Sequence, residues 1–115
     1  MQYLLLIYGN EAAFETVSKE DTERMYAAYG AYTQAMIAAG VMKGADRLQP
    51  STTASTVRVR NDKTEVLDGP YAETKEQLGG YYLVEVPDLD AALTWAARCP
   101  GASHGTIEVR PIWAM

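Results

Sequence analysis

Four segments of the chain carry the hydrophobic patterns of β-strands. Residues 3–8 form an unbroken apolar run, which predicts a strand that is central in its sheet or covered on both faces. Residues 81–86 form a second strongly apolar run, and residues 106–110 alternate apolar and charged side chains until Pro111 ends the ladder. Residues 41–45 predict a shorter strand, whose boundaries are weak because it contains a glycine.

Two helices are predicted between these strands. A capping signal at Ser18 begins the first helix, and its apolar residues recur at spacings of four, three and four before Gly40 ends it. These residues, which we expect on one stripe, are Met25, Tyr29, Tyr32 and Met36. Asp88 is the expected N-cap of the second helix. Its expected inner face consists of Leu89, Ala92, Leu93 and Ala96.

A hairpin and a polar loop precede the second apolar run. Residues 56–60 alternate, residues 61–63 supply turn chemistry and residues 64–67 return, so this stretch predicts a β-hairpin. The tetrapeptide Asp68-Gly69-Pro70-Tyr71 then forces a turn, and residues 72–77 form a polar loop. Loops held on a rigid scaffold often carry function, so this one is a candidate site.

The order of these elements predicts an α+β fold of the ferredoxin-like βαββαβ type with an inserted β-hairpin, in a single domain of residues 1–115. The helices would cover one face of the sheet. Because the chain is rich in Tyr, Leu and Val, we expect the other face to pack against a second sheet in a homodimer. A cleft is expected between the helix layer, the sheet and the inserted loop, or at the subunit junction.

Composition narrows the function classes. The chain carries 15 acidic and 10 basic residues, and its net charge of −5 has the wrong sign for direct nucleic-acid binding. The apolar run at residues 3–8 is too short to span a bilayer, so no membrane partner is expected. Cys99 is the single cysteine, which excludes an internal disulfide and favours a reducing, cytoplasmic location. We expect it to be a small buried hydrophobic residue.

The stretch from Asp68 to Tyr82 resembles the signature of the YCII-related family, in its DGPF subgroup, with Tyr71 where that name expects Phe. The resemblance extends over nearly the whole chain through residues 3–8, 88–93 and 107–111. It implies a dimeric α+β barrel similar to that of muconolactone isomerase, in a family whose biochemical activity is largely undefined. Members of the subgroup are often encoded beside sigma factors of the extracytoplasmic type, so a sigma-factor-related protein is an implied partner.

The resemblance also implies two catalytic candidates. Some members of the wider family carry a histidine in the first helix, proposed to act with an aspartate, and Tyr29 stands at the position of that histidine. Because tyrosine ionises near pH 10, it is a poor general base at neutral pH, although it can orient a ligand. The aspartate carried over from the motif is Asp68. Its alternative role is to cap its own turn, and the alternative for Tyr29 is core packing.

Three residues of the motif loop are candidate ligand-binding residues: Tyr71, Glu73 and Lys75. Lys75 would suit an anionic substrate, whereas the alternative for the charged residues is a solvated surface. Residues 101–105 match the serine-hydrolase pattern G-x-S-x-G, but a helix precedes this serine and a strand follows it, the reverse of the order a nucleophile elbow needs. His104 is expected to be an exposed loop histidine.

No cofactor and no metal site is expected, because one histidine and one cysteine are too few for a structural zinc site and no phosphate-binding glycine motif occurs. Two functions are open. The first is a dimeric small-ligand-binding or regulatory module linked to sigma-factor-dependent transcription. The second is an enzyme of the isomerase or lyase type that uses Asp68 as general acid or base.

Overall fold

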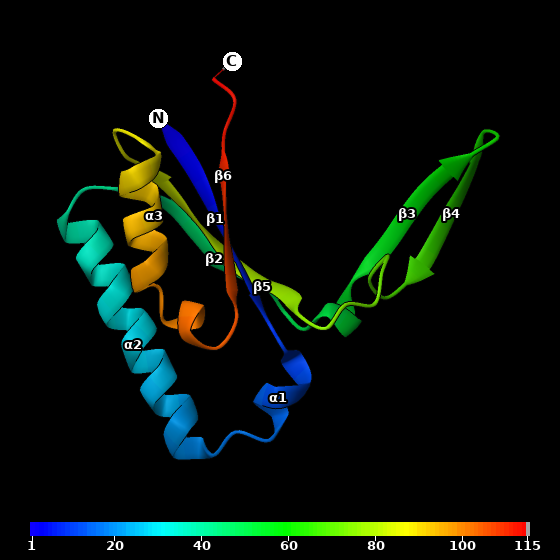
Figure 1. Ribbon diagram of the computed structural model, residues 1–115. Coiled ribbons are helices and arrows are strands. Elements are labelled where there is room, and N and C mark those ends of the chain that lie inside the picture. The colour runs from blue at the N-terminus through cyan, green and yellow to red at the C-terminus, as the bar shows by residue number, and fades with distance from the viewer. Residues whose placement is uncertain (115) are drawn as a thin grey trace.

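The computed structural model describes residues 1–114 and contains a four-stranded antiparallel sheet in the order β2-β5-β1-β6 (Figure 1). In chain order the elements are β1 (Gln2–Gly9), α1 (Glu11–Glu15), α2 (Lys19–Ala38), β2 (Met42–Arg47), the 3-10 turn η1 (Ser51–Thr53), β3 (Ser55–Arg60), β4 (Lys63–Asp68), β5 (Gln77–Glu85), α3 (Leu89–Arg98), the 3-10 turn η2 (Pro100–Ser103) and β6 (Thr106–Pro111). Without the β3–β4 hairpin, this order and pairing are those of the ferredoxin-like fold, so the predicted fold class is confirmed.

Strand β1 lies at the centre of the sheet, paired with β5 on one side and β6 on the other. Tyr3 and Leu5 point into the core beneath the helices and are almost fully buried. Leu4 and Leu6 point to the opposite face, which no helix covers, and are half-buried. Apolar residues on both faces explain why this strand has a continuous rather than an alternating pattern.

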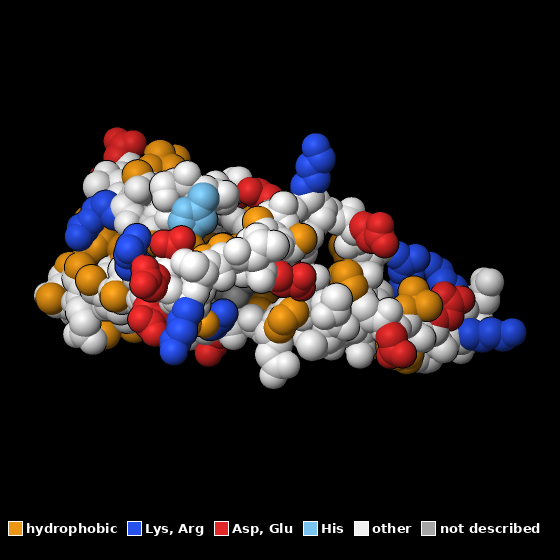
Figure 2. Space-filling view, turned by 90° about the horizontal axis from the view of Figure 1, so that it is seen from below, with side chains coloured by type: hydrophobic (Ala, Val, Ile, Leu, Met, Phe, Trp, Pro, Cys, Tyr) orange, Lys and Arg blue, Asp and Glu red, His pale blue; other side chains and the backbone are white. Residues whose placement is uncertain are grey.

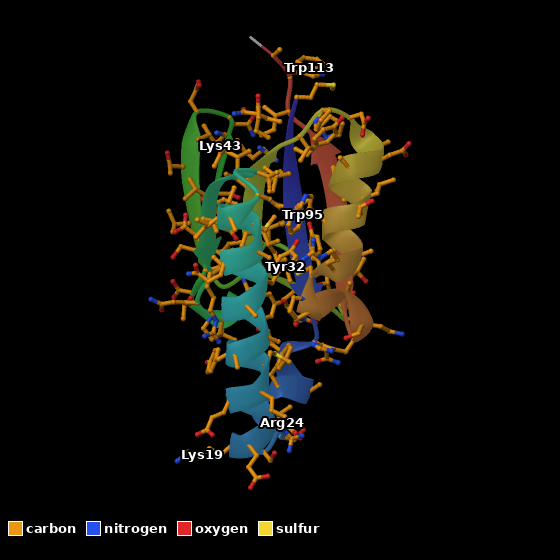
Figure 3. The ribbon with its side chains drawn as sticks, turned by 90° about the vertical axis from the view of Figure 1, so that its left-hand side faces the viewer. Lys19, Arg24, Tyr32, Lys43, Trp95 and Trp113 are labelled. Carbon is orange, nitrogen blue, oxygen red and sulfur yellow. The ribbon has the colours of Figure 1, made fainter. Side chains whose placement is uncertain are left out.

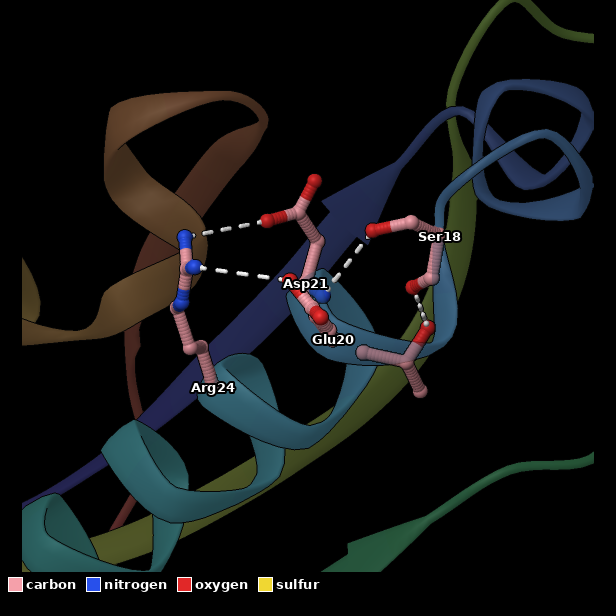
Figure 4. A network of polar contacts seen from close by, with 5 residues as sticks. Ser18, Glu20, Asp21 and Arg24 are labelled. Atoms are coloured by element: carbon pink, nitrogen blue, oxygen red, sulfur yellow. Dashed lines mark hydrogen bonds and ion pairs between the residues drawn. The ribbon is translucent and has the colours of Figure 1, made fainter.

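Helix α2 begins at the predicted capping residue. Ser18 Oγ accepts a hydrogen bond from the backbone N–H of Asp21 at 3.1 Å, which satisfies a donor that the helix itself leaves unpaired (Figure 4). Arg24 forms exposed ion pairs with Asp21 at 3.2 Å and with Glu20 at 4.0 Å. The helix ends before Gly40, whose φ of 72° suits glycine, so both predicted boundaries are confirmed.

The two long helices meet through aromatic side chains. Tyr32 on α2 and Trp95 on α3 pack edge to face with ring centroids 6.1 Å apart, and the Tyr32 hydroxyl donates a hydrogen bond to the Trp95 carbonyl at 2.7 Å (Figure 3). Met36, one turn further along α2, is fully buried. Of the predicted stripe, Tyr32 and Met36 therefore belong to the core.

Helix α3 also begins as predicted, with the Asp88 carboxylate accepting a hydrogen bond from the Ala91 backbone N–H at 2.9 Å. The prediction for its inner face is only half right. Ala92 and Ala96 are buried, but Leu89 and Leu93 are each 46% exposed. The small side chains face the sheet, which lets the helix backbone approach it closely, and the leucines are turned outwards.

Strands β3 and β4 form the predicted hairpin, here called the arm (Ser55–Asp68), on the side of the sheet away from α2 and α3 (Figure 1). Asn61 and Asp62 both have positive φ, which matches the twist of a tight hairpin turn. One face of the arm pairs Val57 with Val66, 60% and 62% exposed, whereas Lys, Arg, Asp and Glu side chains make much of the remaining surface (Figure 2). Among residues 1–114, no helix has the length and apolarity needed to cross a membrane.

Candidate functional site

A cavity of about 640 Å³ lies on the helix-covered side of the sheet, between α1, the first half of α2 and the ends of β1, β2 and β5. Its wall is mainly apolar and aromatic and includes Ile7, Phe14, Met25, Tyr29 and Tyr82. Ligand pockets in proteins commonly measure about 300–1,000 Å³ and are lined in this way. The cavity lies between the helix layer and the sheet, one of the two places where a cleft was expected.

Five of the nine glycines of the chain line this cavity. They are Gly9, Gly79, Gly80, Gly101 and Gly105. At Gly80 a Cβ atom would lie 2.8 Å from the Asp46 carbonyl oxygen, and at Gly101 it would lie 2.5 Å from the Tyr29 hydroxyl. Both distances are shorter than van der Waals contact, so these positions require glycine, and the cavity owes part of its volume to missing side chains.

Glu11 fastens the short helix α1 to the rest of the cavity wall. Its backbone N–H donates to the Gln77 side-chain oxygen at 3.0 Å, and its two carboxylate oxygens accept hydrogen bonds from the Ser51 N–H and hydroxyl, each at 2.8 Å. Asn10 caps the same helix by accepting a hydrogen bond from Ala13. A five-residue helix is marginal by itself, so these tertiary bonds hold it in place.

Tyr29 is the predicted site residue that lines the cavity, where it is half-buried. The Cys99 thiol donates a weak hydrogen bond to its hydroxyl at 3.9 Å, and Cys99 is 3% exposed, as predicted for a small buried residue. Burial raises the pKa of the Tyr29 hydroxyl above its ordinary value of 10.0. The group therefore stays protonated at neutral pH and acts as a hydrogen-bond donor, not as a base.

Arg47 is the last residue of β2 and lies in the cavity wall, where it contacts helix α2. Its guanidinium donates a hydrogen bond to the Tyr26 hydroxyl at 2.9 Å, and its central carbon lies 5.1 Å from the centroid of the Tyr26 ring. Both residues are exposed, and the cation–π contact and hydrogen bond between them favour a position of the guanidinium beside Tyr26. Sequence reasoning did not single out Arg47, which follows a strand whose boundaries were weakly defined.

His104 contributes to the wall at the other edge of the sheet, where its ring packs edge to face on Phe14. The Ser103 hydroxyl donates to the Pro100 carbonyl at 3.0 Å and lies 3.1 Å from His104 Nδ1. With its one proton given to Pro100, the hydroxyl can only accept from His104, an arrangement that requires the tautomer with the proton on Nδ1 and leaves Nε2 as the acceptor. His104 is exposed, as predicted, but its place in the wall was missed.

The same hydrogen bonds bear on the G-x-S-x-G match. Ser103 ends the 3-10 turn η2, with α3 before it and β6 after it. A nucleophile elbow needs the reverse order, a strand before the serine and a helix after it, as the sequence analysis argued. Because its proton is directed at the Pro100 carbonyl, the serine is not paired with a base that would activate it.

The other predicted site residues lie away from the cavity of their own chain. Asp68 is the last residue of the arm, and Tyr71, Glu73 and Lys75 follow it in the loop before β5; all four are exposed and none lines the cavity. Within residues 1–114 the Asp68 carboxylate accepts no hydrogen bond. The turn is held instead by the Gly69 N–H, which donates to the Ala54 carbonyl at 2.6 Å. One chain therefore brings Tyr29 to the cavity, but not Asp68.

Metal ligands do not gather in the described part of the chain: across residues 1–114, no three His, Cys, Asp or Glu side chains are grouped so that they could hold an ion. Arg47, His104 and the Tyr29 hydroxyl are among the polar groups of a wall that is mainly apolar and also includes the carboxylates of Glu11, Glu15 and Asp46. This arrangement can bind and orient an organic molecule through hydrogen bonds and aromatic contacts.

Comparison with known proteins agrees with this architecture. A family model described as the YCII-related domain matches residues 1–115. The chain is 41% identical over 114 residues to "Uncharacterized protein R00369" of Rhizobium meliloti (strain 1021), an alignment that covers 97% of this chain and 92% of the relative. The family match over the full length and the identity to this relative show that the chain belongs to the YCII-related family.

Proposed function

We propose that this protein is a homodimer in which each subunit binds a small organic molecule in the cavity beside Tyr29. The observation that carries the proposal is the cavity itself, about 640 Å³ in volume, with aromatic walls and a few polar groups. The cavity is a cleft that is partly open to solvent, and the Glu11 bonds brace its wall, which gives it the character of a binding site.

The second subunit is proposed from the surface that one chain leaves uncovered. Leu4 pairs with Leu83 and Leu6 with Tyr81 on the face of the sheet that has no helix layer. Contiguous apolar surface of this kind is typical of interfaces, and face-to-face packing of two sheets buries it. The radius of gyration of 16.2 Å exceeds the roughly 13 Å of a compact domain of this length. A subunit with an extended arm that contacts a second subunit is expected to have such a value.

The arm supports the same proposal. An isolated two-stranded hairpin is marginally stable in water, and the valine face of this one has no cover within its own chain. Figure 1 places the arm beside the uncovered face of the sheet, so a second copy seated on that face would lie next to it. Contact between the valine face and the second copy would stabilise both the arm and the dimer.

A direct test is a thermal-shift screen against lactones, small aromatic acids and keto acids. Binding raises apparent stability by about 2.7 kcal/mol when the ligand is at a hundred times its dissociation constant. The control is Ala45→Trp, which fills the cavity from an exposed position on β2. We expect a ligand that stabilises the natural protein and not the variant. Ligands that stabilise both equally would bind elsewhere and would contradict the proposal.

An enzyme of the isomerase or lyase type is the second candidate, and the free Nε2 of His104 favours it. A basic nitrogen at an apolar cavity is a common acid or base in proton transfer. In this alternative Asp68, the general acid or base inferred from the family motif, would have to act on the cavity of the partner subunit, because it does not line its own. Turnover of a bound ligand that is lost in both Asp68→Asn and His104→Gln would support this function.

A regulatory link to an extracytoplasmic-type sigma factor belongs to the first candidate and rests on the family resemblance. Its test is direct binding of the purified protein to a purified extracytoplasmic-type sigma factor from the same organism, with and without a ligand found in the screen. No binding in either state would remove the transcriptional role and leave ligand binding.

A further inference from the structure

Arg47 is a charged residue of the cavity wall that forms no ion pair within the described part of the chain. Within residues 1–114, no carboxylate oxygen lies within 4.0 Å of its guanidinium. Its one hydrogen bond goes to the neutral Tyr26 hydroxyl, and the remaining N–H groups of its planar fork are free. A guanidinium with free donors is suited to a carboxylate or another planar anion.

The acidic residues near Arg47 are otherwise engaged. Both oxygens of the Glu11 carboxylate accept hydrogen bonds from Ser51. The Asp46 carboxylate accepts a hydrogen bond from the Tyr81 hydroxyl at 2.5 Å, and both residues point to the uncovered face of the sheet. Glu15, the remaining acidic residue of the wall, is exposed at the far end of α1. These carboxylates keep their negative charge, but the oxygens of Glu11 are occupied and Asp46 faces away, so at the β2 end of the cavity the N–H groups of Arg47 are the polar groups left to bind a ligand.

Strand register gives the distance across the sheet beneath the cavity. Arg47 pairs with Gly80, Gly80 with Ile7 and Ile7 with Ile107, so this row crosses all four strands at one level. Three spacings of about 4.8 Å between strands make a row about 14 Å long. Arg47 lies at one end of it, and His104, three residues before Ile107, lies towards the other. Between them the floor has no side chain at Gly80, and the walls are aromatic.

We propose that the cavity binds an elongated organic anion: one acidic group held by Arg47, and a flat apolar body that extends across Gly80 towards His104. This inference rests on the proposed function and specifies its ligand class. Arg47 determines the specificity for the charge, and the aromatic walls bind the apolar body whatever its charge. Charge recognition and binding of the apolar body can be tested separately, because different residues are responsible for each.

The test uses two fluorescent probes with one skeleton, anilinonaphthalene sulfonate, which is an anion, and N-phenylnaphthylamine, which is neutral. Each is titrated into the natural protein, Arg47→Gln, Arg58→Gln and the cavity-filling variant Ala45→Trp. Arg58 is an exposed arginine on the arm and serves as the matched control. We expect Arg47→Gln to raise the Kd of the anionic probe about tenfold or more, and to leave the neutral probe within about twofold. Arg58→Gln should change neither.

Four other outcomes contradict one or both statements. If both probes bind and Arg47→Gln weakens them equally, or changes neither, the cavity is a binding site but Arg47 does not select an anion, so the inference is wrong and the proposed function stands. If neither probe binds, or if both still bind to Ala45→Trp, the probes do not occupy the cavity and the proposed function fails together with the inference.

Discussion

Gly101 and the hydroxyl of Tyr29 are packed so closely that a single added methyl group does not fit between them. A Cβ atom at residue 101 would lie 2.5 Å from the hydroxyl oxygen and 3.2 Å from Ile7 Cγ2. The turn η2 and helix α2 are therefore matched to one another at this point, and the position of the Tyr29 side chain in the cavity depends on the glycine.

A double-mutant cycle tests this relationship. We expect Gly101→Ala to lower the free energy of unfolding by about 1–3 kcal/mol, because the methyl group pushes Tyr29 out of its place. In a Tyr29→Phe background the same change should cost clearly less, since the hydroxyl is gone. Urea unfolding at one protein concentration measures all four proteins. Equal costs in both backgrounds would mean that Gly101 is needed for another reason.

The free energy of unfolding should fall at alkaline pH because one thiol and two tyrosine hydroxyls are buried in the fold. Burial raises the pKa of the Cys99 thiol above its ordinary 9.0, and burial likewise raises the pKa values of Tyr29 and Tyr32 above 10.0. Above the ordinary values the unfolded chain releases protons that the fold retains, so the fold loses stability as pH rises and is unaffected below about pH 8.

Unfolding measured at a series of pH values checks this expectation. Cys99→Ala should remove the part of the fall that begins near pH 9.0 and leave the later part, which belongs to the tyrosines. A free energy of unfolding that rises or stays constant above this pH would contradict the burial of these hydroxyl and thiol groups.

The role of Asp68 can be separated from that of its neighbour. Asp68→Asn should change stability by less than about 0.5 kcal/mol, because the exposed carboxylate accepts no hydrogen bond within the described part of the chain. Gly69→Ala should cost about 1–3 kcal/mol, since φ at Gly69 is 104°, a conformation that alanine adopts only with strain. A large loss in Asp68→Asn would instead support the turn-capping role.

The hydrogen bonds around His104 predict one tautomer. His104 is the single histidine, so its two ring nitrogens give isolated signals in nitrogen NMR spectra. We expect the neutral ring to carry its proton on Nδ1, held by Ser103, and expect Ser103→Ala to shift the population towards the Nε2–H form. A natural protein that already has the proton on Nε2 would mean that the serine donates to the histidine.

A charged substitution on the uncovered face of the sheet tests the proposed dimer. Leu6→Lys places an ammonium group at the centre of that face and should convert a dimer to a monomer in sedimentation velocity experiments. Leu93→Lys is the matched control, because Leu93 is exposed on the outer side of α3 and its substitution should leave the mass unchanged. A monomeric natural protein would remove the second subunit from the proposal.

Local signals in the sequence were sufficient for the elements and for much of the fold. The apolar run of β1, the caps at Ser18 and Asp88 and the turn at Asn61 act within a few residues, so each could be recognised without tertiary information. Helix α1 was missed because five residues are too few for a helical period.

The inner face of α3 and the residues of the cavity depended on tertiary packing and could not be predicted from local signals. Periodicity placed both alanines and leucines of α3 on one inner face, but the distance between helix and sheet selects the alanines, and that distance is a tertiary property. A cleft in this region was expected, but its polar residues were hidden, because Arg47 and His104 share it only through the register of four strands. The clustering of glycines around residues 79–80 and 101–105 was the one signal in the sequence for a space without side chains.

Two adjacent glycines of the cavity floor differ in how freely they can change. A Cβ atom at Gly80 would collide with the Asp46 carbonyl, but a Cβ atom at Gly79 would meet only the Ile7 carbonyl oxygen, at an ordinary 3.8 Å. A small side chain is therefore tolerated at residue 79, at the edge of the cavity, without a clash with the sheet, whereas residue 80 is restricted to glycine. Divergence in ligand size within one scaffold needs no more than this, and it leaves the arginine that faces the ligand in place.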